Sequence, residues 1–142
     1  MLYVSVVAAR ERLGGRWRWP HFAMDELACR CAGRFCAGEY FHDAEFLDGL
    51  EALRAAAGRA LVINSGHRCD QWNAAVGGAA LSQHKRIAVD VSLVAHDRHA
   101  LARMAAAYGF TGQGFARTFL HLDRRARPAS WYYKGARGLW AT

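Results

Sequence analysis

Residues 82–93 read S-Q-H-K-R-I-A-V-D-V-S-L, in which a polar turn leads directly into an alternating segment. From residue 87 onward, apolar residues occupy every second position, with Asp90 among the residues between them. Successive side chains of a strand point to opposite faces, so the pattern predicts a strand over 87–93 with an apolar and a polar face. His84 lies in the turn before this strand, and Asp90 lies on its polar face.

Two further segments have the composition of strands. Residues 60–64 (A-L-V-I-N) are apolar and β-branched, which predicts a buried strand. Residues 119–123 (F-L-H-L-D) alternate again, and His121 and Asp123 share one face. Residues 131–133 (W-Y-Y) are expected to form an edge strand, and residues 111–114 a glycine turn.

Helical segments separate these strands. Residues 21–26 are expected to begin a short helix. Three further segments, of which 71–76 is short, each follow an aspartate that is suited to cap a helix: 44–57 after Asp43, 71–76 after Asp70, and 98–108 after Asp97. Helices and strands follow one another without a regular βαβ period, so the sequence predicts an α+β fold.

The size and composition are those of one compact domain. The chain has 142 residues, of which 53% are hydrophobic, and this excludes a disordered or low-complexity segment. Its net charge of +7 fits either an anionic partner or a solvated basic surface. No apolar run approaches the roughly 18–20 residues of a membrane helix, so no membrane insertion is expected. The short apolar patch at 4–9 is not a signal peptide, which predicts synthesis in the cytoplasm.

Both ends of the chain are basic and rich in aromatic residues. Residues 1–20 contain Gly14, Gly15 and Pro20 as breakers, and they are expected to form an irregular arm. Residues 124–142 are expected to form a C-terminal extension.

Three of the four cysteines fall within C-R-C-A-G-R-F-C, residues 29–36, and the fourth is Cys69. One interpretation is a structural zinc site formed by Cys29, Cys31 and Cys36 and closed by Cys69 or by His42. The other is a set of free or partly paired thiols. The spacing is not that of a standard zinc knuckle, so both interpretations stay open.

His84, Asp90 and His121 form a candidate set for catalytic zinc. Such sites take three protein ligands and leave a fourth position for water. A buried core histidine or a capping aspartate would also account for each of these residues singly.

Five motifs occur in a characteristic order: S-G-H-R at 65–68, N-A-A-V-G-G at 73–78, S-Q-H at 82–84, A-V-D at 88–90 and F-L-H-L-D at 119–123. Their order and spacing resemble the zinc D-Ala-D-Ala carboxypeptidase family, which includes vancomycin-resistance D,D-dipeptidases and phage L-alanoyl-D-glutamate endolysins. Within it, the chain is similar to the small phage or prophage type. The resemblance implies a single peptidase domain over 1–142 with a small, mostly antiparallel, hedgehog-like sheet and helices packed on it.

The resemblance also implies roles for individual residues. The zinc ligands would be His84, Asp90 and His121. Arg68 would be catalytic, by stabilising the developing oxyanion, or would bind the terminal carboxylate of the substrate, and Ser82 would help to hold the substrate. The chain departs from the family pattern in two ways. His84 and Asp90 are six residues apart where the family has seven, and Thr118 and Ala116 stand where many members carry the general base. Asp123 would then be either the base or a residue that orients a ligand histidine.

The implied activity is zinc-dependent hydrolysis of D-alanine-containing peptide bonds in bacterial peptidoglycan, by a monomeric carboxypeptidase or endopeptidase of the endolysin type. The protein would reach the wall after release from the cell or on a phage particle. An alternative is a catalytically weak or inactive wall-binding protein on the same fold. A small zinc protein that binds nucleic acid is a third interpretation, but no nucleic-acid motif is present, so no such partner is expected.

Overall fold

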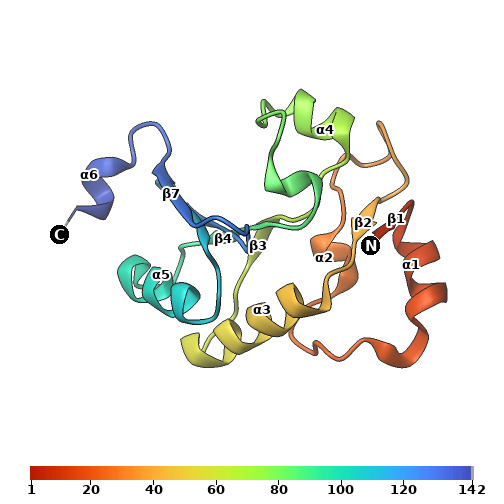
Figure 1. Ribbon diagram of the computed structural model, residues 1–142, viewed down its shortest axis with the longest axis horizontal. Helices are drawn as coiled ribbons and strands as arrows, with labels where there is room; N and C mark the ends of the chain where they lie inside the picture. The colour runs from red at the N-terminus through yellow and green to blue at the C-terminus, as the bar shows by residue number, and fades with distance from the viewer. Residues whose placement is uncertain (142) are drawn as a thin grey trace.

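A five-stranded sheet forms the centre of the fold (Figure 1). The computed structural model describes residues 1–141, and Thr142, the last residue of the predicted extension, lies outside the described residues. The strand order is β3-β4-β6-β5-β7, and all neighbours are antiparallel except β5 and β7. The strands are β3 Ile63–Ser65, β4 Val89–Ser92, β5 Gly112–Phe115, β6 Phe119–Asp123 and β7 Ala129–Tyr132. The prediction of an α+β fold with a mostly antiparallel sheet is confirmed.

Two helices, α3 (Ala44–Ala57) and α5 (Arg98–Ala107), pack together on one side of the sheet (Figure 1). The side chain of Asp43 caps α3 by accepting a hydrogen bond from the Phe46 amide, as its sequence predicts. The helix ends at Gly58 in the left-handed conformation. Its apolar face is buried in the core, which the sequence periodicity also predicts.

Short α4 (Asp70–Ala75) lies on the opposite side of the central strands from α3 (Figure 1). The prediction that Asp70 caps this helix is wrong, because Asp70 is its first residue. The cap is Cys69, whose sulfur accepts a hydrogen bond from the Trp72 amide at 3.4 Å. The strand predicted over 60–64 begins three residues later in the structure, at Ile63, where its pairing with β4 starts. Ala60 and Val62, within the predicted range, are exposed.

The N-terminal residues are ordered, and the prediction of an irregular arm over 1–20 is wrong. They form β1 (Leu2–Tyr3), α1 (Val6–Leu13) and the 3-10 helix η1 (Gly14–Arg16), and β1 pairs with β2 (Tyr40–Phe41). The cause is tertiary packing. Trp19 is only 2% exposed, and its indole N–H donates to Asp48 of α3 at 2.8 Å. Short α2 (Met24–Leu27) begins three residues after the predicted start of its helix.

The predicted glycine turn over 111–114 is also wrong, because these residues lie largely in β5. Glycine is required at 114, where a Cβ atom would come within 2.8 Å of the Trp131 and Tyr133 rings. β7 therefore lies close beside β5, so part of the predicted extension joins the sheet as β7 and a second part forms α6 (Arg137–Trp140). Within residues 1–141, no helix has the length and hydrophobicity of a membrane span.

Candidate metal centre and cleft

The three predicted metal ligands lie together in the structure. Asp90 and His121 are direct partners in the antiparallel register of β4 and β6. His84 reaches them from the 3-10 helix η2 (Gln83–Lys85). His84 Nε2, Asp90 Oδ1 and His121 Nδ1 lie 3.1–3.2 Å from one another, and all three residues are buried. The six-residue spacing from His84 to Asp90 therefore still brings both side chains to one point.

Outer hydrogen bonds fix which ring nitrogens carry protons. His84 Nδ1 lies 2.7 Å from the Gly66 carbonyl oxygen, which can only accept, so this nitrogen donates. His121 Nε2 lies 2.7 Å from the Asp123 carboxylate and also donates. In the neutral rings, the inner nitrogens of His84 and His121 then present lone pairs toward each other and toward Asp90.

Three such acceptors at hydrogen-bond distance repel one another unless a cation lies between them. Two imidazole nitrogens and one carboxylate oxygen are ligands that zinc takes in catalytic sites with an open fourth position. The ligand atoms lie within 4.8 Å of one another, so the arrangement fits one such ion. Hydrogen bonds from outer partners that fix the ligand tautomers are a regular feature of zinc sites.

The charges of the group agree with this arrangement. Burial raises the pKa of Asp90, but its contacts with the His121 and His84 rings outweigh burial and hold that pKa well below its usual range. Burial lowers the pKa of His121, but its contacts with Asp123 and Asp90 outweigh that effect and raise the pKa overall. Asp90 is thus a carboxylate. Its negative charge favours either a second proton on the His121 ring or a metal cation between the three side chains.

These ligands lie in the wall of a cleft of about 420 Å³. The two residues predicted to contact substrate, Arg68 and Ser82, line it as well. The Arg68 guanidinium lies 3.7 Å from the Asp90 carboxylate, and its backbone amide donates to the His84 carbonyl at 2.6 Å. The Ser82 hydroxyl accepts from the His84 amide at 3.1 Å, so it also holds the turn that carries this ligand.

Asp123 lies behind His121 and does not line the cleft. Its side chain is fully buried, and Arg125 donates to its two carboxylate oxygens at 2.8 Å and 2.6 Å. Burial raises the pKa of Asp123, but the hydrogen bonds from Arg125 and His121 outweigh it and hold that pKa well below its usual range. Of the two roles that the sequence leaves open, this geometry matches the orientation of His121.

The sequence reasoning missed three residues that line the cleft, namely Arg125, Trp131 and Tyr133. The Arg125 guanidinium lies 4.7 Å from the Trp131 ring centre, which itself lies 5.1 Å from the His121 ring centre. Burial raises the pKa of Tyr133, and the Asp90 charge adds to this, so its hydroxyl stays protonated. The signal in the sequence was the pair of arginines after F-L-H-L-D, followed by W-Y-Y.

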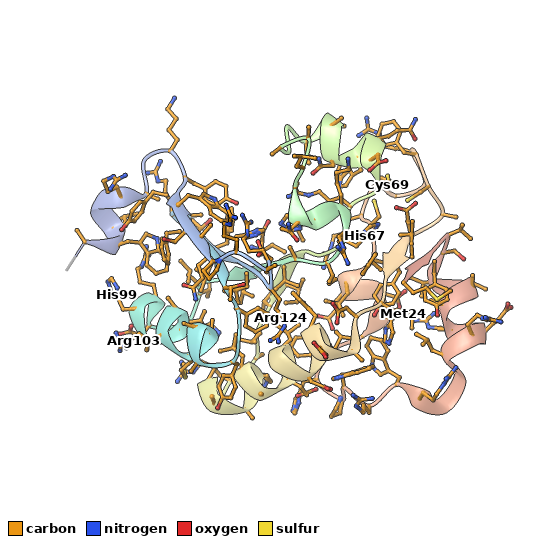
Figure 2. All side chains as sticks on the ribbon, viewed as in Figure 1. Met24, His67, Cys69, His99, Arg103 and Arg124 are labelled. Carbon is orange, nitrogen blue, oxygen red and sulfur yellow. The ribbon has the colours of Figure 1, made fainter. Side chains whose placement is uncertain are left out.

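His67 was the other histidine close to these motifs, but it is 1% exposed and does not line the cleft. Its two ring nitrogens contact the Arg86 carbonyl and the Glu39 carboxylate. The four cysteines form a separate group beside it, and Figure 2 shows His67 and Cys69 on the connection from β3 to α4.

The sequence model of the family described as Peptidase M15 matches residues 20–123. This range includes η2, β4 and β6, and therefore all three members of the His-Asp-His group. A search of curated proteins gave no match. Because the family match covers most of the chain, the protein belongs to the Peptidase M15 family of zinc metallopeptidases.

Proposed function

We propose that the protein is a zinc metallopeptidase that hydrolyses D-alanine-containing peptide bonds of bacterial peptidoglycan, as a carboxypeptidase or an endopeptidase. The observation that carries this proposal is the convergence of His84, Asp90 and His121 in the wall of a cleft that also contains Arg68. The M15 family match supports the same reaction class.

His84 Nε2, Asp90 Oδ1 and His121 Nδ1 would hold the zinc ion, and the Asp123 carboxylate keeps His121 in the required tautomer. When bound, zinc supplies Lewis-acid polarisation of the scissile carbonyl and lowers the pKa of a water molecule. The protein's part is to fix the ligands before the substrate arrives, since each ring is held by an outer acceptor.

The remaining cleft residues favour a substrate with carboxylate groups. Arg68 places positive charge in the cleft, and a guanidinium group binds a carboxylate in forked geometry. The protonated Tyr133 hydroxyl can donate a hydrogen bond to an oxygen that gains negative charge during the reaction. Trp131 forms an apolar wall. Stem peptides of peptidoglycan carry such carboxylates, and the net charge of +7 favours an anionic polymer.

A second candidate function is binding to the cell wall without efficient hydrolysis. It is favoured by the absence of a clear general base among the described residues that line the cleft. Apart from the three metal-site residues, they include no carboxylate and no histidine that could accept a proton from water.

The test is hydrolysis of purified peptidoglycan and of synthetic stem peptides that end in D-Ala-D-Ala, with the products identified by mass spectrometry. We expect product release that a chelator abolishes and added zinc restores. His84→Ala should abolish both product release and zinc binding at this site, whereas His21→Ala, at an exposed histidine on the surface, should preserve both. Sedimentation with the wall but no product from the zinc-loaded protein would refute the peptidase and support the binding protein.

A further inference from the structure

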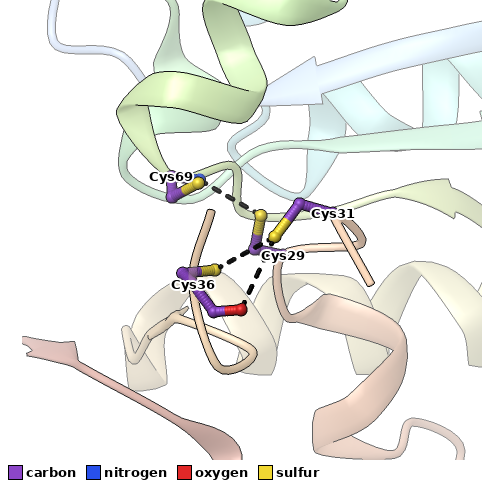
Figure 3. Close-up of side chains that lie close together, drawn as sticks. All are labelled: Cys29, Cys31, Cys36 and Cys69. Atoms are coloured by element: carbon purple, nitrogen blue, oxygen red, sulfur yellow. Dashed lines mark hydrogen bonds between the residues drawn. The ribbon is translucent and has the colours of Figure 1, made fainter. Parts of the chain in front are cut away.

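The sulfur atoms of all four cysteines converge at a second point (Figure 3), and none of these cysteines lines the cleft. Cys29, Cys31 and Cys36 come from the loop between α2 and β2, and Cys69 comes from the start of α4. Their Sγ atoms all lie within 4.8 Å of one another. The other ligand suggested by the sequence, His42, is not part of the group.

His42 lies elsewhere in the structure. Its Nδ1 atom is 2.9 Å from the Tyr40 hydroxyl, and its ring packs against Trp19. This excludes the arrangement in which His42 closes the cysteine site and leaves Cys69 as the fourth member. It also provides a control residue, because His42 is of a metal-binding type but stands apart from the sulfurs.

The distances match a four-sulfur metal site. Zinc binds thiolate sulfur at about 2.3 Å, so the edges of a regular tetrahedron of sulfurs are about 3.8 Å long. The Sγ atoms of Cys31 and Cys36 are 3.5 Å apart. Disulfides would join the cysteines in pairs and would not require all four sulfurs to meet, whereas one metal ion does.

Backbone amides point at the sulfurs as they would at thiolates. The Cys69 amide donates to Cys29 Sγ, the Trp72 amide to Cys69 Sγ, and the Glu39 amide to Cys36 Sγ, each at 3.4 Å. Such donors stabilise negatively charged sulfur. Two arginines between the cysteines in sequence, at positions 30 and 34, add positive charge to the same loop.

The fourth sulfur belongs to Cys31, which is 1% exposed. Its Sγ atom lies 3.5 Å from Cys36 Sγ and 3.7 Å from the Cys36 carbonyl oxygen.

We propose that Cys29, Cys31, Cys36 and Cys69 bind one zinc ion as four thiolates. The ion replaces the four thiol protons, which pass to the solvent, and no coordination position is left for water or substrate. The site is therefore structural. It joins the α2–β2 loop to the segment that precedes α4.

That segment leads directly to the metal centre in the cleft. The Gly66 carbonyl accepts the hydrogen bond from His84 Nδ1, and Arg68 lines the cleft. Gly66 packs so tightly against α2 that a Cβ atom would lie 2.6 Å from the Leu27 carbonyl oxygen. A zinc ion at the cysteines would hold both sides of this contact and thereby fix the position of the segment.

The test is the zinc content of protein purified under reducing conditions, measured by plasma mass spectrometry. We expect two zinc ions per chain in the native protein, one in His84→Ala, one in Cys36→Ser, and none when both changes are combined. The matched control His42→Gln should retain two. X-ray absorption of zinc-loaded His84→Ala should then show sulfur neighbours alone, at about 2.3 Å.

The opposite pattern would overturn the proposal. It consists of one zinc ion in the native protein, none in His84→Ala, and no sulfur in the zinc coordination shell. Two disulfides found by mass spectrometry in the protein purified without reductant, with no sulfur-bound zinc, would equally overturn it. The absorption measurement uses intact cysteines, so it decides the matter even if Cys36→Ser fails to fold. None of these measurements depends on hydrolysis. The proposal of a cysteine zinc site is therefore tested separately from the proposed peptidase activity.

Discussion

Replacing Asp123 with asparagine separates its two conceivable roles. The carboxylate accepts one hydrogen bond from His121 Nε2 at 2.7 Å and two from the Arg125 guanidinium at 2.8 Å and 2.6 Å. An asparagine has one acceptor oxygen and one NH₂ group. In either orientation of the amide, the NH₂ group therefore faces an N–H donor of His121 or of Arg125. No water can accept from these donors instead, because the side chain at 123 is fully buried.

The lost interaction sets the size of the effect. A hydrogen bond to a charged group contributes about 1.5–3 kcal/mol. Loss of a carboxylate that orients a ligand histidine typically weakens metal affinity about 10–100-fold, or roughly 1.4–2.7 kcal/mol. We therefore expect Asp123→Asn to bind zinc at the His-Asp-His group about 10–100-fold more weakly and to lose activity chiefly through lost metal.

The assay has two parts, competition for zinc against a chromophoric chelator and turnover at saturating zinc. Excess zinc should restore most of the activity of Asp123→Asn. The control is Asp25→Asn, at an exposed carboxylate paired with Arg10, which should change neither quantity. Unchanged zinc affinity together with a loss of about 10²–10⁴-fold in turnover at saturating zinc would refute this reasoning and make Asp123 the general base.

Three further substitutions test other parts of the structure. Arg68→Lys should keep its zinc content and lose about 10- to 100-fold in kcat/KM, because an ammonium cannot reproduce a forked contact; a change within about twofold would remove Arg68 from the substrate site. Gly66→Ala should destabilise the fold by about 1–3 kcal/mol through overlap with the Leu27 backbone, measured by urea unfolding. Leu50→Ala should lower the free energy of unfolding by about 2–5 kcal/mol, because this α3 side chain is fully buried, and an effect below 1 kcal/mol would contradict its place in the core.

Elements with strong local patterns could be predicted from the sequence. Helix α3 has an aspartate cap, apolar residues at helical spacing and a glycine stop, and strand β6 alternates cleanly. The N-terminal region could not be predicted in the same way. Its order depends on contacts with distant segments, such as the Trp19 indole donating to Asp48, and sequence spacing does not show such contacts.

Glycine caused the error at β5. Gly114 resembles a turn residue locally, yet its missing side chain is what allows the Trp131 and Tyr133 rings to approach. The same parallel pairing of β5 with β7 brings Trp131 to the cleft, and for that reason the aromatic wall escaped sequence reasoning. The residues named by motif, His84 and His121 among them, were brought together as expected because they lie in or beside paired strands.

Anomalous diffraction from crystals of the zinc-loaded protein, recorded on both sides of the zinc absorption edge, tests the central claim most directly. We expect a zinc peak about 2.0–2.2 Å from His84 Nε2, Asp90 Oδ1 and His121 Nδ1, with its fourth position open to the cleft. The absence of a zinc peak among these three side chains, in crystals grown with excess zinc at neutral pH, would contradict the account.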